Sequence, residues 1–208
     1  MSARHVAVVL AAGGSRRLGR PKQLLTRAGE PLLCRAARLA LATAPVRVLV
    51  IVGAGHAAMA AALHESPVET LLNPDWEQGL STSLRVAADA LATAAGSCLI
   101  LGCDQPALER SHLEALLALA HGPASGCAAT VHGDLAGIPA VVPMTLLRQA
   151  AALHGDQGLR GVLRALPEAE LGRLEASELR FDIDTPEQLR AAVGAGWVDP
   201  VDPVEPAR

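Results

Sequence analysis

The sequence is almost free of aromatic side chains, with two tryptophans, one phenylalanine and no tyrosine among its 208 residues. Half of the residues are nevertheless hydrophobic, so alanine, leucine and valine must fill the core. A chain of this length suits one domain. We therefore expect a single domain over residues 1–196, followed by a proline- and aspartate-rich tail, residues 197–208, that is flexible.

The chain also lacks a strong charge excess, since its formal net charge is −3. This balance argues against general nucleic-acid binding, which favours a basic surface. No apolar run reaches the roughly 18 residues of a membrane span, and a signal-peptide pattern is absent. The four cysteines form no C-x-x-C pair and no zinc-ligand spacing, which is typical of reduced cytosolic thiols. We expect a cytoplasmic protein that binds neither nucleic acid nor membrane.

One stretch near the start, residues 6–25, combines features that suit a polyanion. Its apolar, β-branched run predicts a buried strand over Val6–Leu10. The strand opens into a loop with Gly13, Gly14 and several cations. Glycines let backbone amides approach phosphate oxygens, and cations neutralise their charge. Neither a Walker A motif nor G-x-G-x-x-G is present, so the alternative is a surface turn with solvated cations.

Strand and helix patterns alternate along the rest of the chain. We predict strands over residues 46–52, 68–72, 98–101, 127–131 and 138–142, and a short strand end over 181–184. We predict helices over residues 32–44, 57–64, 80–95, 111–120, 144–153, 158–166 and 186–193, with Ser81 and Ser111 as amino-terminal caps. This order predicts a single-domain α/β fold, a Rossmann-like, mostly parallel sheet with helices on both faces. Its ligand should lie beyond the carboxyl ends of the strands.

Three aspartates are candidates for chemistry at that edge. Asp104 directly follows a predicted buried strand, where a carboxylate suits a Mg²⁺ ion that bridges phosphates. Asp182 and Asp184 alternate on an extended segment and so share one face; one of them could complete the magnesium shell. The alternatives are a turn role for Asp104 and a helix cap formed by Asp184 and Thr185.

Residues 10–22, LAAGGSRRLGRPK, resemble the L-A-A-G-x-S-x-R-[ML]-G-x-P-K signature of small nucleotidyltransferases. Within that group the chain looks like the MocA-type molybdenum cofactor cytidylyltransferases of the MobA-like NTP transferase family, and the resemblance extends from Val6 to about Leu189. It implies a nucleotide-diphospho-sugar transferase-like fold. It also implies transfer of CMP from CTP to the terminal phosphate of molybdenum-molybdopterin, with release of pyrophosphate, and a molybdenum hydroxylase that receives the product.

The resemblance also implies a set of site residues. Arg17, Lys22 and Asp104 are the implied catalytic residues, with Lys22 expected in a solvated loop, and Asp104 and Asp184 the implied Mg²⁺ ligands. The implied nucleotide-binding residues in the first motif are Leu10, Ala11, Ala12, Gly13, Gly14, Ser15, Gly19 and Lys22.

Later motifs extend this set. Residues 73–84 resemble an N-P-x-W-x-x-G-x-x-x-S-L block whose glycine and serine contact the base, which implies that role for Gly79 and Ser83. Residues 155–160 resemble a G-D-x-G-x-R motif, which makes Asp156 and Arg160 candidates for acceptor binding. Turns and helix caps are the alternatives for these residues.

The choice of nucleotide rests on two positions of the first motif. Guanylyltransferase relatives resemble L-A-G-G with aspartate before the lysine, whereas this chain has Ala12 and Pro21, which favours CTP over GTP. Three alternatives stay open: another NTP such as GTP, another small phosphorylated acceptor, and a non-catalytic carrier of the pterin cofactor.

Overall fold

A seven-stranded sheet forms the centre of the computed structural model, which describes residues 4–133, 135–151 and 158–201. The strand order is β5-β4-β1-β6-β8-β7-β9. The strands of this sheet are β1 (His5–Ala11), β4 (Val48–Val52), β5 (Glu69–Leu72), β6 (Ser97–Gly102), β7 (Ala128–His132), β8 (Leu135–Pro143) and β9 (Gly172–Glu175). A separate hairpin joins β2 (Thr26–Arg27) to β3 (Glu30–Pro31).

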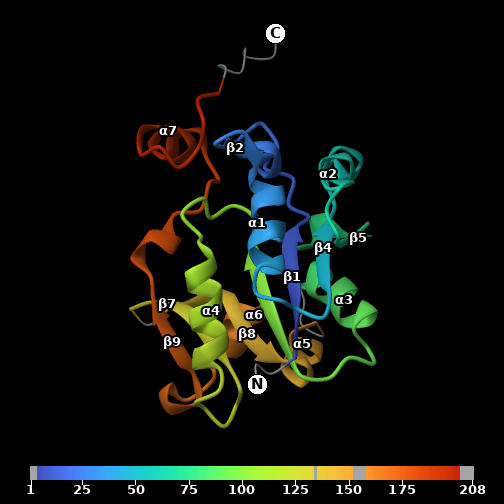
Figure 1. Cartoon of the computed structure of the whole chain (residues 1–208), viewed down its shortest axis with the longest axis vertical. Helices are drawn as coiled ribbons and strands as arrows, with labels where there is room; N and C mark the ends of the chain where they lie inside the picture. The colour runs from blue at the N-terminus through green and yellow to red at the C-terminus, as the bar shows by residue number, and fades with distance from the viewer. Residues whose placement is uncertain (1–3, 134, 152–157, 202–208) are drawn as a thin grey trace.

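The sheet is mostly parallel, as predicted. β1 pairs in parallel with β4 on one side and with β6 on the other, and β8 runs antiparallel to β6 and β7. Leu10 lies opposite Gly102 in the β1–β6 register. The carboxyl ends of β1 and β6 therefore meet at one edge, the upper end of the sheet in Figure 1.

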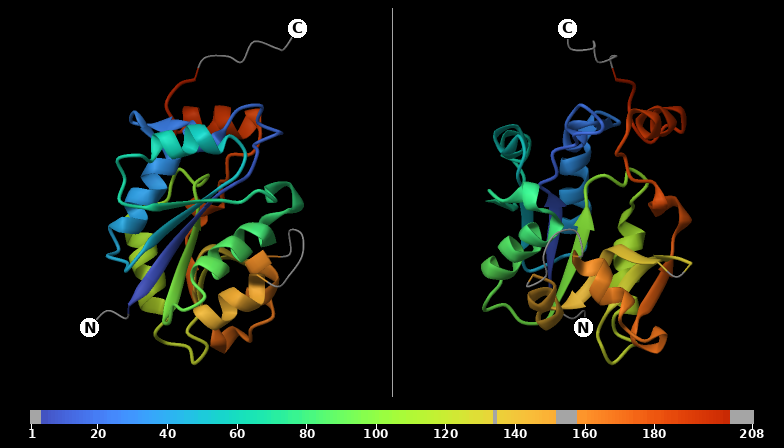
Figure 2. Two further views of the ribbon diagram at one scale, coloured as in Figure 1. Left: turned by 90° about the vertical axis from the view of Figure 1, so that its right-hand side faces the viewer. Right: turned by 180° about the vertical axis from the view of Figure 1, so that it is seen from behind.

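Helices cover both faces of the sheet, as the left-hand view of Figure 2 shows. Side chains alternate along β1, so that Val8 faces one hydrophobic cluster and Val9 the other. The first cluster includes residues of α3 (Leu80–Ala90), α5 (Met144–Ala151) and α6 (Gly158–Arg164). The second includes residues of α1 (Leu32–Leu41), α2 (His56–Ala62) and α4 (Arg110–Leu119). Both faces of the central strands are therefore buried away from water, which explains their continuous apolar runs.

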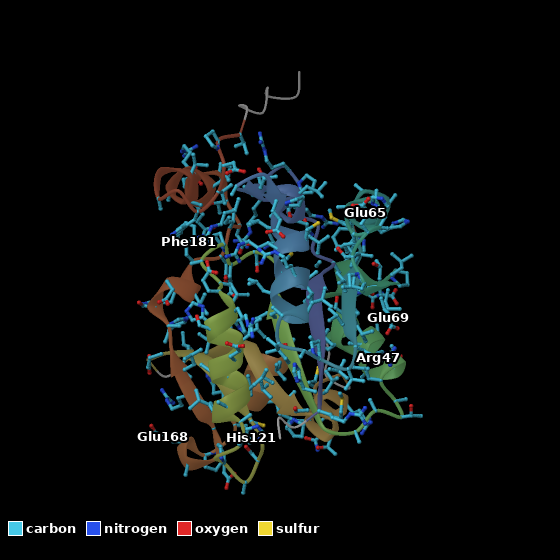
Figure 3. All side chains as sticks on the ribbon, viewed as in Figure 1. Arg47, Glu65, Glu69, His121, Glu168 and Phe181 are labelled. Carbon is cyan, nitrogen blue, oxygen red and sulfur yellow. The ribbon has the colours of Figure 1, made fainter. Side chains whose placement is uncertain are left out.

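A third, smaller cluster lies under α7 (Pro186–Gly194), where the end of the described chain returns to its beginning. Phe181, which is labelled in Figure 3, packs edge-to-face with Trp197, and the ring centroids are 5.2 Å apart. The Asp199 carboxylate accepts hydrogen bonds of 2.8 Å from the Ala28 and Gly29 amides at the β2–β3 turn. The packed body therefore extends to Val201, beyond the boundary expected at residue 196, and residues 202–208 lie outside the described residues.

Several local predictions are wrong. Residues 181–184 are not a strand; the sheet edge is instead formed by β9. Ser81 lies inside α3, which begins after Gly79, and Ser111 lies inside α4, where Glu109 and His112 form a capping box. The cap at Thr185 is confirmed, since its side chain accepts a hydrogen bond from the Gln188 amide.

The cysteines and the lengths of the helices were also considered from the sequence. All four cysteines are free thiols. Among the helices of the described residues, none combines the length and the hydropathy required to cross a bilayer.

Candidate active site

The loop after β1 is held in shape by one buried side chain. Gln23, which is 1% exposed, lies in the short 3₁₀ helix η1 (Lys22–Leu24). Its amide nitrogen donates to the carbonyls of Ala11 at 2.9 Å and Gly13 at 2.7 Å. Ser15 Oγ donates to Gln23 Oε1 and accepts from the Lys22 amide at 3.2 Å. These bonds fix the loop at the end of β1 before any ligand arrives.

The same loop leaves backbone donors open. Over the ranges that the structure describes, the amides of Gly13 and Gly14 donate to no protein acceptor. Ser15 takes the left-handed conformation with φ of 50°, so the chain turns sharply beyond them. Consecutive open amides in such a turn form a concave surface that attracts anions. The loop is thus suited to phosphate oxygens, as the sequence indicates.

Lys22 joins the two aspartates that sequence reasoning assigned to a metal. Its ammonium nitrogen lies 2.6 Å from Asp104 Oδ2 and 2.7 Å from Asp184 Oδ1. Asp104 follows β6, Asp184 precedes α7, and Arg17 lies 2.9 Å from the other oxygen of Asp184. Three distant segments thus converge at one point. The Lys22 side chain is only 14% exposed, so the expectation that it lies in a solvated loop is wrong, because both carboxylates cover it.

Charges in this cluster shift its pKa values. Burial alone would lower the pKa of Lys22, but the charge and hydrogen bond of Asp104, together with Asp184, outweigh burial and raise it above its ordinary value. Burial would raise the pKa of Asp184, yet Lys22 and then Arg17 hold it below its usual range. For Asp182, burial and then the neighbouring Asp104 charge raise the pKa to about 7. Lys22 and Asp184 are therefore charged at neutral pH, whereas Asp182 holds its proton more readily than an exposed aspartate does.

The donor set fits a divalent cation that is shared with a ligand. Asp104 and Asp184 already point oxygens at a single cationic centre, the Lys22 ammonium. Within the described part of the chain, no three acidic, histidine or cysteine side chains gather as a metal site. Mg²⁺ commonly takes one or two carboxylates and completes its shell with water and substrate phosphates. Both aspartates therefore suit an ion that arrives with a polyphosphate.

A cavity of about 430 Å³, here the first cavity, lies between this cluster and the loop. It is lined by most of the residues that the resemblance implies for nucleotide binding and catalysis: Leu10, Ala11, Ala12, Gly13, Gly14, Ser15, Lys22, Gly79, Ser83 and Asp104. Gly19 and Arg17 are not among its lining residues. Arg17 instead contacts Asp184 with a side chain that is 72% exposed, and Arg16 lines the cavity in its place.

Sequence reasoning missed the aromatic wall of the first cavity. The Arg16 guanidinium lies over the Trp76 ring, 5.3 Å from its centroid, and forms an ion pair with Glu77. A methyl group on Gly14 would come within 2.6 Å of that ring, and one on Gly53 within 2.7 Å of Trp76 Cβ. The rarity of tryptophan in this chain was the available signal, since a ring kept in an aromatic-poor sequence suits a specific packing role.

The opposite wall of the first cavity is formed by the start of α3. Asn73, buried after β5, donates its amide protons to Thr82 Oγ1 at 2.8 Å and Ser83 Oγ at 2.9 Å. Ser83 is therefore held in a fixed rotamer. Gly79, with φ of 108°, brings the backbone to the cavity without a side chain.

A second cavity of about 380 Å³ adjoins the first, since Leu80, Asp104 and Ile138 line both. Arg160 of α6 and Asp182 also line it. The candidate Asp156 lies outside the described residues. The site is therefore a pair of adjoining cavities with Asp104 at their junction, which is the arrangement that transfer between two substrates requires.

The fold and this site define the class of the protein: an α/β nucleotidyltransferase domain with its phosphate loop after the first strand. Residues 7–171 match the family described as the MobA-like NTP transferase domain, and the chain belongs to it.

Alignments with several relatives cover most of the chain. It is 34% identical to the purine catabolism protein PucB of Bacillus subtilis and 33% identical to nicotine blue oxidoreductase of Paenarthrobacter nicotinovorans; each alignment covers 88% of this chain and 93% of the relative. It is 26% identical to the molybdenum cofactor cytidylyltransferase of Escherichia coli, over 89% of this chain and 93% of that protein.

Solved structures agree on the fold. A nucleotidyl transferase from Methanothermobacter (Mth528) superposes with a TM-score of 0.78 at 25% identity, covering 93% of this chain and 97% of that one. Rv0371c of Mycobacterium tuberculosis gives a TM-score of 0.78 at 26% identity, covering 92% of this chain and 98% of that one. The predicted nucleotide-diphospho-sugar transferase-like fold is confirmed.

Proposed function

We propose that the protein transfers CMP from CTP to the terminal phosphate of molybdenum-molybdopterin in the cytoplasm, forming the cytosine dinucleotide cofactor for a molybdenum hydroxylase. The observation that carries this proposal is the convergence of Lys22, Asp104 and Asp184 beside open loop amides. Membership of the MobA-like family supports an NTP as donor. The Escherichia coli relative named a molybdenum cofactor cytidylyltransferase supports CTP and the pterin acceptor.

CTP occupies the first cavity in this proposal. Its triphosphate lies along the loop, where the Gly13 and Gly14 amides are open, and its base lies toward Gly79 and Ser83 on the opposite wall. A backbone group and a hydroxyl with a fixed position can read the hydrogen-bonding edge of a pyrimidine.

The chemistry needs positioned charge rather than a strong base. An oxygen of the acceptor phosphate, already an anion, forms a bond to the α-phosphorus of CTP. The bond from that phosphorus to the bridging oxygen breaks, and pyrophosphate leaves with the electron pair. Lys22, which lines the first cavity, neutralises the charge that grows on the leaving group, and Arg17 contributes through its contact with Asp184. A Mg²⁺ ion held by Asp104 and Asp184 would supply Lewis-acid polarisation of the α-phosphate.

Names among the relatives define the competing activities. One relative is named an oxidoreductase and another a purine catabolism protein, so the assay includes GTP, other phosphorylated acceptors and a reduced nicotinamide cofactor. A carrier of the pterin cofactor would need neither the paired carboxylates nor the lysine between them.

The test incubates the purified protein with each of the four NTPs, Mg²⁺ and molybdenum-molybdopterin. Parallel reactions replace the pterin with other phosphorylated acceptors or add a reduced nicotinamide cofactor. Released pyrophosphate and the dinucleotide product are quantified. We expect both only when CTP and acceptor are present together. Pyrophosphate with GTP alone among the nucleotides would contradict the choice of CTP. Pterin binding without any pyrophosphate would favour the carrier.

Asp104→Asn tests the magnesium assignment in the same assay. We expect turnover to fall at least about 100-fold and the Mg²⁺ titration to flatten, because the carboxylate at the junction of the cavities is lost. Asp89→Asn is the matched control, since Asp89 is an exposed aspartate of α3 outside both cavities. An unchanged magnesium dependence in Asp104→Asn would refute the ligand role.

A further inference from the structure

The second cavity is lined by two arginines that form no ion pair with a carboxylate of the described residues. Arg160 of α6, Arg180 at the end of η5 (Ser177–Arg180) and His132 at the end of β7 all line it. In the part of the chain that the structure describes, neither guanidinium has a hydrogen bond or an ion pair. By contrast, Arg27 and Arg35 both pair with Glu109.

The backbone that presents Arg180 is anchored on two sides. Gln105, nine-tenths buried in the cavity wall, donates its side-chain amide to the Leu179 carbonyl at 2.8 Å and to the Ile138 carbonyl at 3.2 Å. On the other side, His112 Nε2 lies 2.9 Å from the Glu178 carboxylate. Arg180 therefore leaves a fixed backbone position, although its own side chain is exposed.

The charge of Arg180 acts on His132, another residue that lines the second cavity. Burial and then the Arg180 charge lower the pKa of His132, against the opposing effect of the Glu175 and Glu178 charges. Two acids also line this cavity: Asp104, which Lys22 neutralises at 2.6 Å, and Asp182. The cations therefore lie in one cavity with the junction aspartate, and an anionic ligand would satisfy guanidinium groups that the protein leaves unpaired.

We infer that Arg180 and Arg160 together bind the phosphate of the acceptor in the second cavity, which makes the acceptor a phosphomonoester and Arg180 a specificity-determining residue. Guanidinium groups bind phosphate through two parallel hydrogen bonds. The body of the acceptor lies along Leu80, Leu135 and Ile138, of which Leu80 is 37% and Leu135 51% exposed. That the bound anion is the acceptor rests on the proposed function, whereas the anion site does not depend on it.

Kinetics with Arg180→Gln and Arg160→Gln test the assignment. We expect each to raise the KM for the phosphorylated acceptor about 10- to 100-fold, the effect of losing a charge-assisted hydrogen bond, and to change the KM for CTP less than about twofold. Arg180→Lys keeps the charge but loses the planar fork, so its acceptor KM should fall between wild type and Arg180→Gln.

Arg164→Gln is the matched control. Arg164 lies four residues after Arg160 on α6 but lines a different cavity, so both KM values should stay at wild type. An unchanged acceptor KM in folded Arg180→Gln would overturn the inference. An equal rise in the KM for CTP would also overturn it, because Arg180 would then serve the nucleotide.

A second measurement needs no turnover. Arginine side chains are labelled with phenylglyoxal, with and without inorganic phosphate at constant ionic strength, and each site is quantified by mass spectrometry. Phosphate should protect Arg160 and Arg180 but not Arg164. Equal labelling of the three would overturn the anion site. Protection without nucleotidyl transfer from any NTP would retain the anion site and refute the proposed function. Transfer that Arg180→Gln leaves unchanged would retain the proposed function and refute the role of Arg180.

Discussion

Lys22 binds two carboxylates that come from segments 82 and 162 positions away in the sequence. It is also the only lysine in the chain. Substitution by methionine would leave Asp104 and Asp184 facing each other without a cation. Because they are partly exposed, at 24% and 34%, we expect Lys22→Met to lower the free energy of unfolding by about 1–3 kcal/mol, less than for a fully buried pair.

Urea unfolding at neutral pH measures this loss, and turnover is followed in parallel. Lys22→Arg, which keeps a cation, should recover most of the stability but little of the turnover, since its longer planar group fits the same space differently. Unfolding of Lys22→Met at the wild-type midpoint would show that the ion pairs contribute nothing to the fold.

At Gly53, stability depends on the space around the residue rather than on charge. A methyl group there would lie 2.7 Å from the Ala12 carbonyl and 2.7 Å from Trp76 Cβ. Because a backbone atom and a ring must move, we expect Gly53→Ala to lower the free energy of unfolding by about 1–3 kcal/mol and to weaken CTP binding by displacing the loop. Thermal denaturation and equilibrium dialysis measure the two effects.

Gly13→Ala is the control, because nothing lies within 4 Å of a methyl group at that position. Its stability should stay within about 0.5 kcal/mol of wild type. If both variants lost stability equally, loop flexibility rather than contact with Trp76 would explain the result.

At the scale of elements, the edge strand β5 pairs in parallel with β4 and also forms an ion pair with Arg47, the residue before β4. Arg47 donates to both Glu69 carboxylate oxygens, at 2.7 and 2.8 Å, and both residues are labelled in Figure 3. The Arg47 hydrogen bond holds the pKa of Glu69 below its usual value. This stabilisation is therefore present above the ordinary glutamate pKa of about 4.3 and is lost as pH falls through the lowered value.

Glu69→Gln should consequently lower the free energy of unfolding by about 0.3–1 kcal/mol at pH 7 and by less below about pH 4, because the pair is exposed. Urea titrations at both pH values measure it. Glu65→Gln, on an 88% exposed side chain, should change little at either pH. If the loss of unfolding free energy in Glu69→Gln were larger at the acidic pH than at pH 7, the predicted pH dependence would be wrong.

Element prediction from the sequence succeeded where burial was two-sided and failed at edges and caps. The run Val48–Val52 is buried throughout and therefore shows an unbroken apolar pattern. The strand Gly172–Glu175 lies at the sheet edge with partly exposed side chains, so it has no such pattern. The predicted caps at Ser81 and Ser111 were wrong because the backbone geometry of Gly79 and the partner of Glu109 depend on tertiary structure. The cap at Thr185 was predictable because Thr185 and Gln188 form a local pair.

At the scale of the whole molecule, the site was predictable as a set of residues but not as a set of contacts. The motifs named Lys22, Asp104 and Asp184, and the structure joins them. No local pattern indicates that Arg16 rather than Arg17 lines the first cavity, because this depends on Trp76, sixty positions away. Arg180, for which we propose a role, gave no local signal for the same reason: η5 is held beside the second cavity by tertiary contacts, among them those with Gln105 and His112.

The cluster under α7 joins the two ends of the described chain and should open on its own. It contains Leu18 and Leu25 from the loop region and Leu189 and Val198 from the end, and it is separate from the two clusters that cover the sheet. Trp197→Ala removes the ring that packs on Phe181. We expect a local cost of about 1–3 kcal/mol and faster amide exchange over residues 186–201, with β1 and β6 unchanged.

Hydrogen exchange followed by mass spectrometry measures this, and Trp76→Ala is the matched control because it removes the other tryptophan. Trp76 packs on Gly14 and Gly53, so its loss should speed exchange in the loop after β1 and leave α7 protected. Faster exchange of β1 and β6 in Trp197→Ala would show one cooperative unit instead. Because Asp184 lies just before α7, opening of this cluster should also weaken its contact with Lys22 and lower turnover without changing the sheet.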